Sequence, residues 1–295
     1  MKSDRKMKRV WVCGSKGQLG LSLQGIVGGS KHRYFFTDVD EVDICSRDNV
    51  EEYVRQNEID VIINCAAYTA VDAAEKDKEK AYAVNHLAVE NLSLVAEKNG
   101  VFLIHISTDY VFDGRASRPY MEDDAVNPMS VYGDSKWKGE RAIEESGCKY
   151  IILRTAWLYS QYGKNFVKTM IRLTSEKESI SVVNDQRGCP TYAGDLARVI
   201  YDVVERDDYE KNQGVYHYVG GGSCSWWELA REVARVAGND RCEIKPCTTS
   251  EYPTAAHRPA YSVLDARKVQ ETFGIEIPHW KEALRKCMAN IKKGE

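Results

Sequence analysis

RVWVCGSKGQLG, residues 9–20, carries the clearest structural signal in this chain. Residues 9–13 form a short apolar run of the kind that becomes a buried strand, and Leu19, Leu23 and Ile26 then recur at helical spacing. The spacing Gly-x-x-Gly-x-x-Gly between them allows a sharp turn, and it lets backbone N–H groups approach a pyrophosphate that a β-carbon would obstruct. A strand, a glycine turn and a helix in this order favour a nucleotide site, and the alternative is a tight turn with no ligand.

Further apolar runs follow the first one, and segments with helical periodicity lie between them. They occupy residues 34–37, 60–67, 101–107 and 149–154. This alternation predicts an α/β fold with a doubly wound parallel sheet of the Rossmann kind and right-handed crossovers. Continuous apolar runs suit strands that are buried on both faces, as in a parallel sheet.

Beyond residue 155 the alternation becomes irregular and predicts a second, smaller domain that begins with a loop-rich lid. A helical pattern over residues 195–205 and a strand pattern over 215–219 are then expected to rejoin the first sheet. The predicted division is a dinucleotide-binding domain of residues 1–155 with 195–219, and a mixed substrate-binding domain of residues 156–194 with 220–295.

Composition excludes several classes of partner. The chain has 295 residues, of which 43% are hydrophobic, enough to fill a core. Its 41 basic and 44 acidic residues give a net charge of -3, which argues against nucleic acid or an anionic membrane as partner. No apolar run reaches the roughly 18 residues of a membrane span and no signal peptide is apparent, so we expect a cytoplasmic protein. The nine cysteines include no Cys-x-x-Cys pair, which predicts reduced thiols and no zinc site.

VYGDSK, residues 131–136, combines a tyrosine and a lysine four positions apart. On a helix, Tyr132 and Lys136 share one face, so both side chains can reach the same point. A free phenol has a pKa of about 10, and an ammonium group about 4 Å away contributes about 4 kcal/mol at an effective dielectric of about 20, enough to lower that pKa. The pair therefore predicts proton transfer, and the alternative is a chance pairing on a surface helix.

Polar segments directly follow two of the buried runs. Tyr68 and Thr69 come after the third run, and Thr108 comes after the fourth. Because open α/β sheets bind ligands at the carboxyl ends of their strands, we expect these side chains to meet in a site. His105, inside the fourth run, is predicted to be a core histidine, and Asn85, in the middle of a long helix, to bridge helices by hydrogen bonds.

Asp38 closes the second apolar run, about where a dinucleotide site places an acid on the adenosine ribose. A carboxylate there favours an unphosphorylated 2′-hydroxyl, whereas Lys16 and Arg33 could hold a 2′-phosphate, so NADH and NADPH both remain open. The alternative for Asp38 is a solvated loop carboxylate. Asp43 and Ile44, in the loop that follows, are further candidates for the cofactor site.

Several short blocks of the sequence resemble those of known protein families, and together they span nearly the whole chain in order. They are residues 14–20, 64–72, 107–112, 131–136, 154–157, 183–186 with 190–191, and 258–259 with Ser262 and Leu264. The glycine turn, the Tyr-x-x-x-Lys pair and the hydroxyl residue between them resemble the extended short-chain dehydrogenases/reductases. The Asn-Asp-Gln and Arg-Pro blocks are narrower and resemble the dTDP-4-dehydrorhamnose reductase family, in which an alanine is usual at the position of Cys65.

This resemblance implies NADPH- or NADH-dependent reduction of the 4-keto group of dTDP-4-dehydro-L-rhamnose to dTDP-L-rhamnose, in deoxysugar and cell-surface polysaccharide biosynthesis. It implies that Tyr132 protonates the developing alkoxide, that Lys136 lowers the phenol pKa and binds the nicotinamide ribose, and that Thr108 hydrogen-bonds the carbonyl. The other implied contacts are cofactor binding by Gly14, Gly17, Gln18, Leu19, Gly20, Asp38, Ala67, Tyr68 and Thr69, and substrate binding by Thr108, Asp109, Trp157 and Val71.

Arg258 is expected to bind the substrate diphosphate, because a guanidinium group suits phosphate oxygens, and a structural salt bridge is the alternative. Some relatives hold magnesium near a subunit interface, but Ser22 stands where they would place a carboxylate, so we predict no metal. A homodimer is the commonest closed assembly. The resemblance leaves two other functions open: a non-catalytic NADP-binding subunit like the β subunit of methionine adenosyltransferase, and a reductase for another nucleotide sugar.

Overall fold

The computed structural model describes residues 7–207 and 209–294, and its centre is a six-stranded parallel sheet. The strand order is β10-β5-β4-β3-β1-β2, so the order reverses between β1 and β3, as in other doubly wound sheets. The predicted parallel sheet is therefore confirmed, including the return of the chain to its edge as β10. The strands are β1 (Arg9–Cys13), β2 (Arg33–Thr37), β3 (Val61–Asn64), β4 (Phe102–Thr108), β5 (Lys149–Thr155) and β10 (Gly214–His217).

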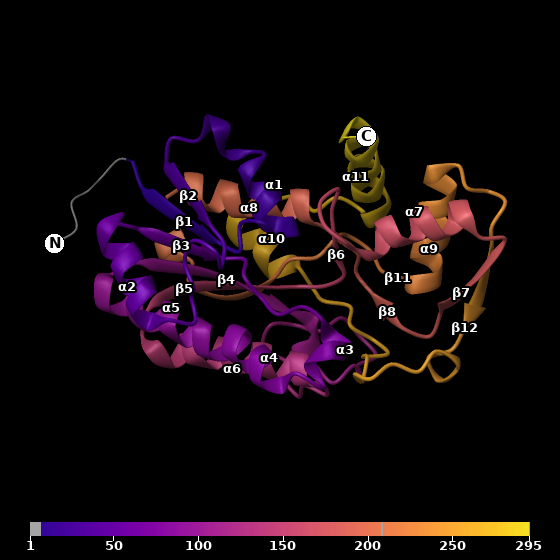
Figure 1. Ribbon diagram of the computed structural model, residues 1–295, viewed down its shortest axis with the longest axis horizontal. Helices are drawn as coiled ribbons and strands as arrows, with labels where there is room; N and C mark the ends of the chain where they lie inside the picture. Colours follow the sequence, from indigo (N-terminus) through magenta and orange to yellow (C-terminus); the bar gives the residue numbers. More distant parts are fainter. Residues whose placement is uncertain (1–6, 208, 295) are drawn as a thin grey trace.

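Helices cover both faces of this sheet, because its strands are apolar on both sides (Figure 1). Trp11 and Ile62 point into one hydrophobic core, whereas their neighbours Val10 and Ile63 point into the other. The first core is covered by α2 (Arg47–Gln56), α5 (Ala88–Asn99) and α6 (Val131–Ser146), and the second by α1 (Gln18–Gln24), α8 (Ala193–Glu205) and α10 (Arg267–Phe273).

A π-helical segment interrupts the long helix that precedes β4. It covers Ala83–Leu87, between α4 (Lys78–Tyr82) and α5. The predicted long helix is present, but its hydrophobic spacing gave no sign of the π segment, which adds a residue to one turn. Asn85 lies within this segment and is fully buried.

The remaining elements form a second region with its own hydrophobic core, at the right of Figure 1. Its strands pair two by two, β6 with β9, β7 with β12 and β8 with β11. Helix α10, which the sequence placed in this region, instead packs in the core of the main sheet through Val269 and Phe273. We propose the two-domain division with α10 counted with the sheet. The elements of the second region are β6 (Leu158–Tyr159), α7 (Phe166–Glu176), β7 (Ser179–Val183), β8 (Arg187–Gly188), β9 (Thr191–Tyr192), β11 (Cys224–Ser225), α9 (Trp226–Ala237), β12 (Glu243–Cys247) and α11 (Trp280–Gly294).

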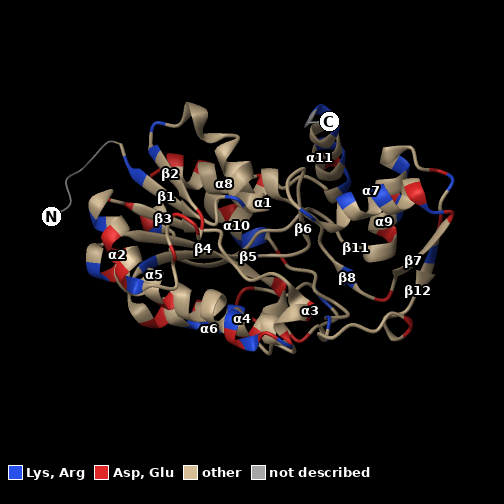
Figure 2. Ribbon diagram, in the orientation of Figure 1, with Lys and Arg blue, Asp and Glu red and all other residues tan. Residues whose placement is uncertain are grey.

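Acidic and basic residues are interspersed along the helices of both regions (Figure 2). This distribution agrees with the near balance of acidic and basic residues in the sequence. In the described part of the chain, none of the helices combines the length and apolar character needed to cross a membrane.

Candidate active site

A cleft of about 580 Å³ lies at the carboxyl ends of β1, β3, β4 and β5, between the sheet and the second region. The glycine turn forms one wall. Gly14 has φ +70°, and a β-carbon there would lie 2.6 Å from the Ala66 nitrogen. A β-carbon on Gly20 would meet Gly14 O at 2.5 Å. Close approach of the protein's own backbone therefore requires glycine at both positions, and Gly17, Gln18 and Leu19 face the cleft.

The acid expected at the adenosine ribose contacts the same turn. Asp38 Oδ2 accepts a hydrogen bond from the Lys16 backbone N–H at 2.9 Å. The Lys16 ammonium, considered for a 2′-phosphate, is 2.7 Å from Asp40 and 3.5 Å from Glu41. The cation that could favour NADPH is thus already paired with carboxylates at the surface, where such pairs are weak.

Some of the other cofactor candidates line the cleft, and others do not. Ala67 and Thr69, after β3, line the cleft together with Val71, the first residue of α3 (Val71–Ala74). Asp43 and Ile44 are not among the lining residues: the Ile44 side chain packs in the core beside β1, and Asp43 accepts a hydrogen bond from the Cys45 N–H. A further residue, Tyr68, is held through its backbone by the Asn85 side chain.

Tyr132 and Lys136 both line the cleft from the first turns of α6. Ser130 caps this helix, because its hydroxyl accepts from the Gly133 N–H at 3.1 Å. The Lys136 ammonium donates to the carbonyl of Ile106 at 2.6 Å and lies 3.3 Å from His105 Nε2. The predicted shared face is therefore present, and the lysine is also anchored to β4.

The pKa of Tyr132 departs from the direction expected from the sequence. Burial raises it above the usual value, a hydrogen bond with Thr108 lowers it, and Asp109 and Tyr110 raise it further. The net direction is upward, because the ring is buried and the nearest negative charge comes from Asp109. Thr108 lies at the end of β4, where its hydroxyl also donates to Asp109 Oδ1 at 3.0 Å.

Asp109 is 2% exposed, and burial raises its pKa to about 6, against hydrogen bonds from Ser262 and Thr108. Its second carboxyl oxygen, Oδ2, is buried without a hydrogen-bond partner among the described residues. A carboxyl group that is buried and half satisfied inside a cleft is a candidate to bind a polar ligand.

Trp157 occupies a strained backbone position at the mouth of the cleft. Its φ is +49°, which is rare for a residue with a large side chain. The indole ring stacks on Trp226 with ring centres 3.5 Å apart and an angle of 9°. A β-carbon on Gly188 would lie 2.5 Å from this ring. Trp226 was not singled out in the sequence, where its position at the start of a capped helix gave no sign of the stack.

Arg258 reaches the cleft from the second region. Its Nη2 forms a 2.6 Å ion pair with Asp72, which follows the first residue of α3, and its Nη1 donates to the Tyr110 hydroxyl at 3.4 Å. The alternative of a structural salt bridge is therefore present. The buried Nε has no hydrogen-bond partner among the described residues, so part of the guanidinium group remains available.

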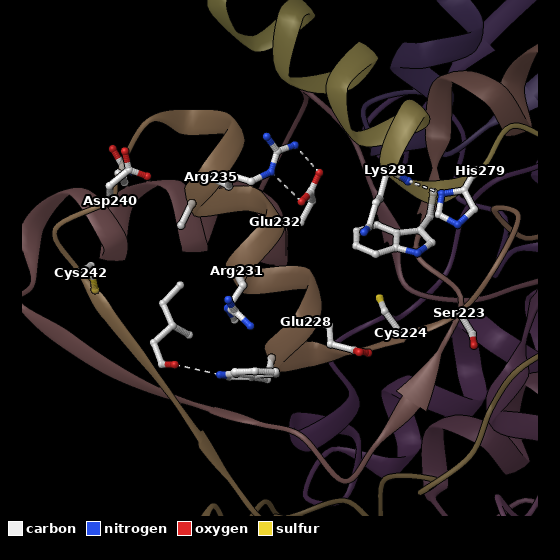
Figure 3. Close-up of a pocket in the computed structure, with 15 residues that line it drawn as sticks. Ser223, Cys224, Glu228, Arg231, Glu232, Arg235, Asp240, Cys242, His279 and Lys281 are labelled. Atoms are coloured by element: carbon white, nitrogen blue, oxygen red, sulfur yellow. Dashed lines mark hydrogen bonds and ion pairs between the residues drawn. The ribbon is translucent and has the colours of Figure 1, made fainter.

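A second hollow, of about 690 Å³, lies on another side of α9 (Figure 3). Two of its charged side chains, Arg235 and Glu232, form an ion pair at 2.7 Å, and a third, Arg231, lies over the ring of Trp227. None of the catalytic candidates lines it. The cleft that holds Tyr132 is therefore the candidate active site.

A proton donor beside a glycine-lined cradle, at the edge of a doubly wound parallel sheet, defines a dinucleotide-dependent reductase of the extended short-chain dehydrogenase/reductase class. The chain belongs to the family described as RmlD substrate binding domain, which it matches over residues 7–293.

The chain is similar over nearly its full length to proteins of known name. It is 40% identical to a dTDP-4-dehydrorhamnose reductase from Aggregatibacter actinomycetemcomitans, over 96% of this chain and 99% of the relative. A crystal structure of such a reductase from Clostridium acetobutylicum superposes with a TM-score of 0.92 at 41% identity, and one from Bacillus anthracis in complex with NADP with 0.91 at 38%. Each pair covers 96% of this chain and 99% of the other.

Residues 7–207 and 209–294 contain no group of three or more His, Cys, Asp and Glu side chains placed to hold an ion. Ser22, at the position considered for a magnesium ligand, is buried, and its hydroxyl donates to the Gln18 carbonyl at 2.8 Å.

Proposed function

We infer that this protein is a dTDP-4-dehydrorhamnose reductase, which reduces the 4-keto group of dTDP-4-dehydro-L-rhamnose to dTDP-L-rhamnose with NADPH or NADH. The observation that carries this function is the convergence of Thr108, Tyr132 and Lys136 on the cleft beside the glycine turn, in a chain of this family. The product is an activated deoxysugar of the kind used in cell-surface polysaccharide synthesis.

The cofactor supplies a hydride when bound, and the protein supplies the proton. Tyr132 donates its phenolic proton to the oxygen at C4, where negative charge develops as the carbon is reduced. Thr108 hydrogen-bonds the same oxygen and orients the carbonyl. Lys136 would hold the nicotinamide ribose and supply a new proton to the tyrosinate that Tyr132 becomes after its own proton has passed to the substrate.

The residues present fit a dinucleotide, because the glycine turn that follows β1 lies open to the cleft. Gly17, Gln18 and Leu19 would meet the pyrophosphate, and Asp38 the adenosine ribose. Ala67, Tyr68 and Thr69 would line the nucleotide chain. Asp43 and Ile44 remain candidates through their backbone atoms, since the Ile44 side chain is committed to the core.

The substrate would lie on the other side of the cleft. Asp109 offers a buried carboxyl oxygen to a sugar hydroxyl, and Trp157 lines the same cleft. Val71 lies close enough to the cleft to exclude water from the sugar ring. Arg258 would turn its unpaired Nε toward the diphosphate.

Oxidation of NADPH and NADH, followed at 340 nm, tests the function with a panel of dTDP-, UDP- and GDP-linked 4-keto sugars. We expect turnover with the dTDP-linked 4-keto-rhamnose precursor at the highest kcat/KM, with NMR of the product fixing the configuration at C4. Equal turnover of a UDP- or GDP-linked sugar would assign the enzyme to another nucleotide sugar.

We also propose that the protein is cytoplasmic and forms a homodimer, in keeping with a small-molecule biosynthetic role. Sedimentation equilibrium of the full chain measures the assembly. A regulatory subunit would instead bind NADP, leave every sugar of the panel unchanged and be retained by a methionine adenosyltransferase in a pull-down. The intact set of Thr108, Tyr132 and Lys136 favours the enzyme.

A further inference from the structure

A chain of hydrogen bonds beneath the cleft connects Asn64, His105 and Lys136. The three residues are 0%, 0% and 1% exposed. Asn64 ends β3, His105 lies next to it on β4, and Lys136 approaches the histidine ring from α6. Neither Asn64 nor His105 lines the cleft. The proton transfer at Tyr132 gives them no direct role, yet both are polar and fully buried.

The orientation of the Asn64 amide is fixed by the backbone. The Ala66 N–H donates to Asn64 Oδ1 at 3.0 Å, and a backbone N–H has no acceptor function. The amide nitrogen of Asn64 must therefore face His105, whose Nδ1 lies 3.1 Å away. Reversing the amide would place two donors against each other at Ala66 and is excluded by this contact.

The tautomer of His105 follows from this orientation. An amide nitrogen has only donors, so His105 Nδ1 accepts and carries no proton. Burial lowers the pKa of His105 well below its usual value, with Lys136 adding to the effect, so the ring is neutral. A neutral ring with a free Nδ1 carries its proton on Nε2, and this nitrogen faces Lys136 Nζ at 3.3 Å.

An ammonium group cannot accept the hydrogen bond that this ring offers. It has three donors and no lone pair, whereas an amine has one lone pair and two donors. The Lys136 nitrogen already donates to the Ile106 carbonyl, so a lone pair directed at His105 would satisfy every contact. With the amine form of Lys136, each hydrogen bond in the three-residue chain has one donor and one acceptor. With the ammonium form, the His105 Nε2–H would face an N–H of Lys136, and two donors would oppose each other.

The other titratable groups around Lys136 do not restore a strong preference for its charge. Glu140, one turn further along α6, forms a 2.7 Å ion pair with Arg154 of β5. Burial raises the pKa of the Cys65 thiol to about 12, so it is uncharged at neutral pH. Burial lowers the pKa of Lys136 itself to about 8, and Glu140 opposes this shift. The other titratable group in the cleft beside Lys136 is Tyr132.

We propose that Asn64 and His105 are positioning residues that present an N–H to Lys136 and so shift its protonation equilibrium toward the amine form. The proposal rests on the proposed reductase function and deepens it. After Tyr132 has donated its proton, the resulting tyrosinate is reprotonated from the Lys136 ammonium, and the amine left behind regains a proton from solvent. A lysine that gains and loses its proton close to neutral pH suits this exchange.

Asn64→Asp tests the proposal, because it replaces the amide N–H with a carboxylate oxygen that can accept from His105. The ring should then move its proton from Nε2 to Nδ1 and offer its Nε2 lone pair to the ammonium of Lys136. Ring ¹⁵N shifts report the tautomer, and the Cε shift of ¹³C-labelled lysine reports the Lys136 titration. We expect the wild-type proton on Nε2 and a Lys136 pKa higher by about one unit or more in the variant, a tenfold change in the equilibrium.

Two further variants separate the tautomer from the added charge. Asn64→Leu removes the donor without adding charge and should also raise the Lys136 pKa. Asn49→Asp adds the same charge at an exposed position near the start of α2 and should leave it unchanged. In the reductase assay, the pH profile of kcat should shift in the same direction as the Lys136 titration for the two Asn64 variants.

A wild-type ring protonated on Nδ1, or an unchanged Lys136 pKa in both Asn64 variants, would overturn the proposal. Both NMR measurements work without substrate. The expected titrations together with an inactive sugar panel would therefore refute the reductase function and leave the role of Asn64 and His105 standing.

Discussion

Tyr132 is the residue on which the proposed chemistry depends most directly. We expect Tyr132→Phe to lower kcat by about 10²–10⁴-fold, because phenylalanine has no hydroxyl proton to donate to the oxygen at C4 of the sugar. Cofactor binding should persist, since the ring keeps its edge-to-face contact with Tyr110. Turnover by NADPH oxidation and NADPH affinity by calorimetry are the two measurements. Tyr110→Phe is the matched control, and wild-type turnover by Tyr132→Phe would remove the tyrosine from the mechanism.

Asp109 carries a pH dependence of stability that its burial makes predictable. Its pKa is about 6 in the folded protein, above its unfolded value, so its contribution to stability is full at low pH and is lost as pH rises through about 6. Between pH 5 and pH 8 this loss amounts to about 1 kcal/mol. Asp109→Asn removes the ionisation. As pH rises from 5 to 8, the free energy of unfolding of the wild type, measured by urea denaturation, should therefore fall by this amount relative to that of the variant.

The residues that form the site were easier to predict than their burial and their contacts. The sequence correctly brought Thr108, Tyr132 and Lys136 to one cleft, because strand ends and helical spacing are local properties. It gave the wrong direction for the Tyr132 pKa, since burial depends on the packing of the whole cleft. It also treated His105 as an inert core residue. The burial is confirmed, but the contact with Lys136 comes from a neighbouring helix and leaves no mark in the apolar run.

The π segment before α5 is the element that holds the site together. Asn85 within it accepts from the Tyr68 N–H and donates to the Tyr68 carbonyl and to Ser135 on α6. Helix α6 approaches so closely that a β-carbon on Gly139 would lie 2.2 Å from the Asn85 carbonyl oxygen. The segment therefore ties the loop after β3 to the helix that carries Tyr132.

Asn85→Ala should cost about 1–3 kcal/mol of stability, because it leaves two half-buried backbone groups of Tyr68 without their side-chain partner. Asn99→Ala, at the end of the same helix, loses a bond to a carbonyl of its own last turns and should cost far less. Urea denaturation of both variants measures the difference. Equal losses would show that the Tyr68 groups find other partners.

Elements with a strong periodic pattern were predicted well, and elements defined by pairing were not. The strands of the main sheet and helix α8 are confirmed, because their apolar runs are continuous or amphipathic. Strands β6, β8, β9 and β11 each have two residues, too few for a pattern. The Trp157–Trp226 stack likewise joins two segments about seventy positions apart, and only folding brings them together.

Arg258 connects the two regions of the whole molecule through its ion pair with Asp72. If it also binds the diphosphate, Arg258→Ala should weaken dTDP binding by about 10–100-fold, the effect of losing a charge-assisted hydrogen bond. Binding of thymidine, which has no phosphate, should change little. Calorimetry with both ligands measures the contrast.

Arg267→Ala is the control for that prediction, because Arg267 is an exposed arginine paired with Asp265 away from the cleft. A similar loss of dTDP and thymidine affinity in Arg258→Ala would assign the residue to structure alone. Asp72→Asn then shows whether the ion pair or the phosphate contact dominates, since it keeps the guanidinium group and removes its partner.

Strand β10 is synthesised well after β5, the strand with which it pairs. The strand pairs with β5 at the edge of the main sheet, but residues 156–213 are made between the two. While the chain emerges from the ribosome, β5 therefore remains an open edge, and such edges invite pairing with other chains. The main sheet therefore cannot be completed before residues 156–213, which include most of the strands of the second region, have been made.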